Sequence, residues 1–216
     1  MNVRTYLPEI NHIDYTDPRF AIKAITILAA AVIAAVFVSK YAAERFKGKR
    51  KKVTVCTLGV TLFTAFFLIS IYGAGTIAVK GIILALILSY ASYQDIRTRE
   101  CDDCLSLMVV VTALIGKHFA DIPYMILSAM FAGGVMVMSL LLTKSEIGGA
   151  DIKMSVACSF MCGLTAGVAG LLLGMILAVI FNLAKKKRKK SFAMIPYLAC
   201  GYMTAFAYSN MITGGI

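Results

Sequence analysis

Long apolar runs, separated by short charged loops, constrain the fold of this chain more than any other feature. Of its 216 residues, 60% are hydrophobic and only 15% are charged, and the mean hydropathy is +0.82. Soluble domains average roughly 45 to 50% apolar and about 25% charged residues. A helix needs about 20 mostly apolar residues to cross the hydrocarbon core of a bilayer. The sequence therefore predicts an all-α, polytopic integral membrane protein with a single domain over residues 1–216.

Eight segments have the length and composition of membrane spans. They are residues 21–38, 53–72, 75–94, 104–120, 122–142, 152–165, 166–183 and 193–211. The sixth is short, and the turn-like residues 162–167 separate it from the seventh. Residues 1–20 contain prolines and acidic residues but no apolar region, so we expect a short extracytoplasmic tail and no cleaved signal peptide.

The basic residues support this count of spans. The formal net charge is +11, and 17 of the 22 lysines and arginines fall in residues 40–52, 97–99, 144–153 and 185–190. With the N-terminus outside and eight crossings, all four of these regions lie on the cytoplasmic side, as the positive-inside rule requires. The charge is then a topology signal. We expect the run at 185–190 to attract anionic lipids, and we expect no nucleic-acid partner.

Two aspartates stand at the ends of predicted spans on the cytoplasmic side. Asp95 closes the third span, and Asp151 opens the sixth directly after Gly148, Gly149 and Ala150. A carboxylate at a membrane boundary is costly and marks a functional site. The small residues before Asp151 allow another backbone to approach closely. If helix packing brings the two carboxylates together, they form an acid/base pair that can activate water.

Other hydrolytic chemistries lack their residues. The chain has neither an HExxH nor a GxSxG motif, and both histidines, His12 and His118, fall on the predicted outer side. Cys101 and Cys104 form an isolated CxxC, which is a weak zinc signal without a second pair or a histidine. We therefore predict no metal and no cofactor. A serine paired with Lys153 remains conceivable, although no serine is marked out by its setting.

Three motifs in a fixed order resemble those of a known family. DIRTR at 95–99, GGADIK at 148–153 and IPYLACG at 195–201 are similar to the motifs of the GxGD-type membrane aspartic proteases that process type IV prepilins and archaeal preflagellins. The chain departs from the family at two places. Ala150 stands where the family has glycine, and residues 101–103 read Cys-Asp-Asp where the family usually has Ile-Pro-Asn or Ile-Pro-Asp.

The resemblance implies an endopeptidase that cleaves the short basic leader of prepilin-like proteins at the cytoplasmic membrane face. Asp95 and Asp151 would be its catalytic residues, acting as a pair in which neither role can be assigned to one residue. Its partners would be prepilin-like precursors and membrane lipids. The residues expected to contact substrate are Gly148, Gly149, Ala150 and Lys153, with Glu100, Asp102, Asp103 and Glu146 as docking charges.

The resemblance also bears on a second activity. Bifunctional relatives carry a cysteine-bearing cytoplasmic loop after the first span, which is associated with N-methylation of the mature pilin. The corresponding loop here, residues 39–52, is short and contains no cysteine. We therefore expect a peptidase without methyltransferase activity.

Two other functions remain open from the residues alone. Asp95 and Asp151 could bind a proton or cation in a small transporter, or the chain could be an inactive scaffold. The four predicted docking acids could also do no more than balance nearby basic residues at the headgroup surface. Carboxylates within hydrogen-bond reach in a cleft open to the cytoplasm would favour the protease.

Overall fold

The structure is a computed structural model that describes residues 18–48, 50–143, 148–184 and 193–213. Within these residues the chain forms eight α-helices and a short 3-10 helix, with no strand. The elements are α1 (Pro18–Arg45), α2 (Arg50–Tyr72), α3 (Thr76–Thr98), α4 (Asp103–Leu114), η2 (Phe119–Asp121), α5 (Ile122–Thr143), α6 (Gly149–Cys162), α7 (Leu164–Ala184) and α8 (Ile195–Thr213).

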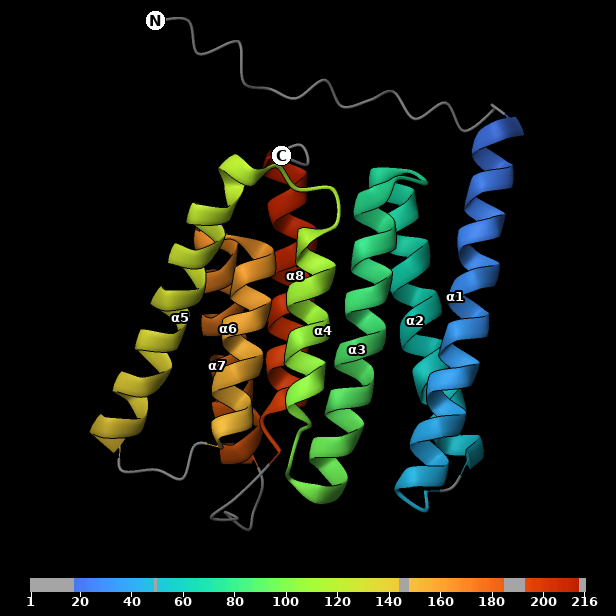
Figure 1. Cartoon of the computed structure of the whole chain (residues 1–216). Helices are drawn as coiled ribbons and strands as arrows, with labels where there is room; N and C mark the ends of the chain where they lie inside the picture. The colour runs from blue at the N-terminus through green and yellow to red at the C-terminus, as the bar shows by residue number, and fades with distance from the viewer. Residues whose placement is uncertain (1–17, 49, 144–147, 185–192, 214–216) are drawn as a thin grey trace, which may run out of the picture.

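The helices lie side by side and alternate in direction, with α1 at one edge of the bundle and α5 at the other (Figure 1). In the described residues, five helices are long and apolar enough to cross a membrane: α1, α2, α3, α7 and the stretch of η2 and α5 from Phe119 to Leu141. Helices α4 and α6 are shorter than about 20 residues. The predicted all-α polytopic membrane fold is confirmed.

Each predicted span corresponds to one α-helix, but the boundaries are shifted, most of all at two places. The predicted span 104–120 is wrong beyond Leu114, where α4 ends. Gly116 adopts a φ of +63° just after it, a conformation that a helix cannot continue through and that favours glycine. The loop after the first span is also shorter than the predicted residues 39–52, because α1 continues to Arg45 and α2 begins at Arg50.

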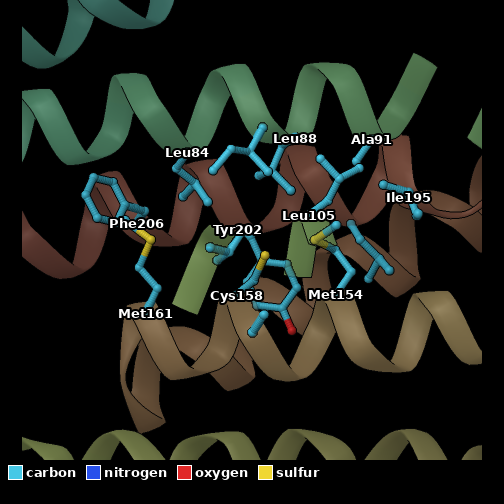
Figure 2. Close-up of a cluster of buried hydrophobic side chains, with 14 of the residues drawn as sticks. Leu84, Leu88, Ala91, Leu105, Met154, Cys158, Met161, Ile195, Tyr202 and Phe206 are labelled. Atoms are coloured by element: carbon cyan, nitrogen blue, oxygen red, sulfur yellow. The ribbon is translucent and has the colours of Figure 1, made fainter. Parts of the chain in front are cut away.

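The core that supports the candidate site lies between α3, α4, α6 and α8. Leu84, Leu88 and Ala91 follow one face of α3, because residues three or four positions apart share a helix face. Figure 2 shows these side chains directed toward Met154 and Cys158 of the α6 region, with Leu105 and Tyr202 between. This face reaches the end of α3 where Asp95 lies.

Glycines fix the position of α8 against α7. A Cβ atom added to Gly201 of α8 would lie 2.3 Å from the backbone oxygen of Gly170 and 2.5 Å from the nitrogen of Gly174, both on α7. The two backbones therefore touch, a packing that only glycine permits. One residue along α8, the Tyr202 hydroxyl bonds the Ser159 hydroxyl at 2.9 Å and donates to the Ser155 carbonyl at 3.1 Å. These contacts hold α8, and thus its first residue Ile195, in a defined place.

Candidate active site

The two aspartates lie at the same end of the bundle. At this end, called the carboxylate end below, α3 finishes and α4, α6 and α8 begin (Figure 1). Asp95 lies one helical turn after Ala91, and Asp151 lies one turn before Met154. Both Ala91 and Met154 point into the shared core (Figure 2), so each aspartate continues the inward face of its helix. The packing thus directs both carboxylates toward the same seam.

Asp95 is held by the first turn of α8. Its side chain is buried, and its Oδ2 atom accepts a hydrogen bond from the Ile195 backbone N–H at 3.0 Å. The Met194 backbone N–H also donates to this carboxylate. The first N–H groups of a helix lack partners within the helix and attract anions. Pro196 follows within the first turn, where a missing N–H costs nothing. The carboxylate of Asp95 therefore caps α8.

Asp151 lies in the first turn of its own helix and precedes the predicted span 152–165. The Gly148 backbone N–H donates to its carboxylate, a local contact typical of an acidic residue at the third position of a helix. Burial and the nearby Asp95 carboxylate raise the pKa of Asp151 to about 7. The two carboxylates are thus close enough to influence each other, and one proton near neutral pH would be held on the pair.

The surroundings of Cys101 indicate that several acidic side chains lie close together. It lies in the loop between α3 and α4, where burial and the charges of Asp95, Asp102, Asp151 and Asp103 raise the pKa of its thiol to about 12. The next cysteine, Cys104, is exposed. In the described residues, no three histidine, cysteine or acidic side chains are grouped so that they could hold a metal ion.

Two of the predicted docking acids form ion pairs with the chain's own cations. Arg45 binds both carboxylate oxygens of Asp102, at 2.7 and 3.3 Å. Lys153 binds both oxygens of Asp103, at 2.7 and 2.8 Å. Glu100 is exposed in the loop after α3, and Glu146 lies outside the residues that the structure describes.

The three small residues before Asp151 begin α6. Gly148 is the N-cap and lies against the carboxylate, since a Cβ added there would be 3.2 Å from Asp151 Oδ2. A Cβ at Gly149 would meet no atom within 4 Å. Gly148 and Gly149 are exposed and Ala150 is partly buried. The backbone before Asp151 is therefore open at Gly149, and contact of these three residues with substrate stays a prediction.

Two residues near the aspartates were not predicted as site residues. Arg45 was predicted only as a topology charge, yet it reaches Asp102 and also donates to the Tyr90 hydroxyl at 3.2 Å. Gln94, next to Asp95, is 3% exposed, and its Oε1 atom has no hydrogen-bond partner in the described part of the chain. An amide in a predicted span was a visible signal for Gln94, whereas no local pattern links Arg45 to Asp102.

Comparison with known proteins finds a family that part of the chain matches. The model of the type IV leader peptidase family matches residues 82–183, a stretch that begins in α3 and ends in α7 and includes both Asp95 and Asp151. No curated protein and no solved structure matches the chain significantly. Helices α1, α2 and α8 lie outside the matched residues. Residues 82–183 thus match the type IV leader peptidase family, in agreement with the family predicted from the motifs.

Proposed function

We propose that this membrane peptidase is an aspartic endopeptidase, with Asp95 and Asp151 as its catalytic pair. The observation that carries the proposal is the electrostatic coupling of two carboxylates that reach the same seam from different helices. Two such groups share one proton, because both cannot ionise easily at close range. Water can then be activated without a metal ion.

The reaction would follow from that shared proton. The ionised carboxylate removes a proton from a water molecule as its oxygen attacks the carbonyl carbon of the scissile peptide bond. The protonated carboxyl group donates a hydrogen bond to the carbonyl oxygen and stabilises the negative charge that develops there. When the intermediate collapses, the C–N bond breaks and a carboxyl group passes its proton to the leaving amine.

The family implies pilin-like precursors as substrates, and the charges at this end of the bundle suit a basic leader. Glu100 is exposed and available as a docking charge, whereas Asp102 and Asp103 are engaged by Arg45 and Lys153. We infer that leader binding depends more on Glu100 than on the two paired aspartates. We further propose that the carboxylate end faces the cytoplasm, because 17 of the 22 lysines and arginines fall in the loops and helix ends of residues 40–52, 97–99, 144–153 and 185–190, which the chain order assigns to this end.

The test is cleavage by the purified protein in lipid nanodiscs. A synthetic pilin-like precursor is incubated with the protein, with S-adenosylmethionine present and with or without a metal chelator, and the products are identified by mass spectrometry. We expect one cut at the end of the leader, a free amine on the mature product, and the same rate with chelator. An intact precursor would contradict the assignment of this pair as a peptidase site and leave the transporter alternative. A methylated product would contradict the expected absence of N-methyltransferase activity.

A further inference from the structure

Two ion pairs surround the candidate active site and connect helices that belong to different parts of the chain. The Arg45 guanidinium, at the last residue of α1, binds Asp102 through two nitrogen atoms. The Lys153 ammonium, on α6, binds Asp103. Arg45 lies outside the residues that match the leader peptidase family, so this contact brings α1 to the site from a region that the family match does not include.

The side chain of Asp102 binds Arg45, although its position at the start of α4 favours a helix-capping bond. Asp102 is the N-cap of α4, where an aspartate normally accepts a hydrogen bond from a backbone N–H of the first turn. Here its side chain makes no such bond and is bound by Arg45 instead. Arg45 also donates to the Tyr90 hydroxyl on α3. One guanidinium thus fixes the start of α4 relative to both α1 and α3.

The second pair continues this connection to the other catalytic helix. Asp103 is the first residue of α4 and directly follows Asp102. Its partner Lys153 lies two residues after Asp151 on α6. The two pairs therefore join α3, which carries Asp95, to α6, which carries Asp151, through the N-cap and the first residue of α4.

We propose that Arg45 and Lys153 are positioning residues, which through Asp102 and Asp103 set the separation of the two catalytic carboxylates. This inference rests on the proposed function, because only a reaction that needs both carboxylates depends on their separation. Exposed ion pairs contribute little to stability. Their effect here is on geometry, and small displacements at a reacting centre have large effects on rate.

The first test measures geometry without activity. In nanodiscs, a maleimide alkylates the native cysteines, and mass spectrometry follows Cys101 against the exposed Cys104. Arg45→Gln and Lys153→Gln should each raise the Cys101 rate by about fivefold while the Cys104 rate is unchanged, because loosening α4 further exposes a thiol that is now partly buried. Lys40→Gln, an exposed basic residue earlier on α1, is the matched control and should change neither rate.

Protein folding is checked in the same spectrum. Cys158 is buried and should stay unmodified in every variant. If Arg45→Gln exposes Cys158, that variant is not properly folded, and Arg45→Lys is used in its place. Arg45→Lys keeps the positive charge but loses the contact through two nitrogen atoms, and it should give an intermediate Cys101 rate. An unchanged Cys101 rate in Lys153→Gln and in the folded Arg45 variant would overturn the proposal.

The second test measures catalysis through charge exchange. Lys153→Asp should lower kcat by about tenfold, a larger effect than any on KM, because it displaces a catalytic group. The double variant Lys153→Asp with Asp103→Lys restores an opposite pair and should recover most of the loss. A change in KM alone, or no recovery in the double variant, would overturn the positioning role. If the wild type cleaves no precursor while Cys101 still responds as expected, the proposed function fails and the role of the two pairs in holding α4 stands.

Discussion

Asp95 ends a long helix and is held by the start of another, whereas Asp151 lies in the first turn of its own helix. The bond to Asp95 comes from Ile195, which is 100 positions away in the sequence, and that bond is buried. The contact of Asp151 comes from Gly148, three positions away, and the surrounding glycines are exposed. One carboxylate is therefore fixed by tertiary structure and the other by its local backbone.

Under the proposed mechanism, this difference would let the pair be both stable and reactive. Asp95 contributes to the fold because it satisfies buried backbone N–H groups at the start of α8. Asp151 is freer to change its protonation state, and its pKa of about 7 lies near neutral pH. Substitutions at the two positions should thus have the same effect on catalysis but different effects on folding.

The largest expected effect treats the two aspartates alike. Asp95→Asn and Asp151→Asn should each lower the cleavage rate by about 10² to 10⁴-fold, because each removes one member of the acid/base pair while keeping side-chain size. The rate is measured with a pilin-like precursor in nanodiscs. Asp121→Asn, the same change at the opposite end of the bundle, is the control. Near-normal turnover in either variant would remove that residue from the pair.

The pH dependence sharpens the comparison. Because the pKa of Asp151 is raised to about 7, its protonated form dominates below that pH and is lost as the pH rises through it. A pair that needs one proton should therefore lose activity above neutral pH, by about tenfold for each pH unit. The measurement is kcat between about pH 5 and pH 9. A rate that kept rising with pH would show that the pair does not need this proton.

A smaller effect is expected where the local backbone holds Asp151. Gly148→Ala places a methyl group 3.2 Å from the Asp151 carboxylate and should lower kcat by several-fold, since the carboxylate must shift. Gly149→Ala meets no atom and should have a smaller effect on kcat. The kcat values of the two variants are compared. A larger loss in Gly148→Ala would support a displaced carboxylate. Equal losses in both variants would instead indicate that both glycines contact the substrate.

The smallest expected effect is on stability, and it should differ between the two aspartates. Asp95→Ala leaves the buried Ile195 N–H without an acceptor and should lower the free energy of unfolding by about 1 to 3 kcal/mol. Asp151→Ala removes a partly exposed contact at a helix start, worth about 0.3 to 1 kcal/mol, and also removes repulsion from Asp95. Thermal unfolding in detergent should therefore give the lower Tm for Asp95→Ala. A lower Tm for Asp151→Ala would contradict the fixed role of Asp95.

The sequence predicted the helices well because membrane spans are long apolar runs, and it placed Asp95 and Asp151 at helix ends for the same reason. It could not predict that α4 ends at Leu114, because the apolar run continues to Ile115 and the stop comes from the backbone at Gly116. The IPYLACG motif marked Ile195 through family resemblance, yet its N–H bond to Asp95 appears only in the packed helices.

The docking acids illustrate a second limit. Asp102 and Asp103 were predicted to receive a basic leader, and that role stays a prediction. Their pairing with Arg45 and Lys153 depends on contacts between residues 57 and 50 positions apart, which no local pattern reveals. The number of acidic residues in a loop does not show which of them are available to a substrate and which are already paired with the chain's own cations.

The most direct test of the central claim, that the two carboxylates act as a coupled pair, is a titration of Asp151. Carbon-13 NMR of labelled aspartates in nanodiscs, assigned with Asp151→Asn, gives the pKa of Asp151 in the wild type and in Asp95→Asn. We expect about 7 in the wild type and a lower value in Asp95→Asn, because neutralising Asp95 removes a charge that raises it. The same pKa in both proteins would contradict the pairing of Asp95 with Asp151.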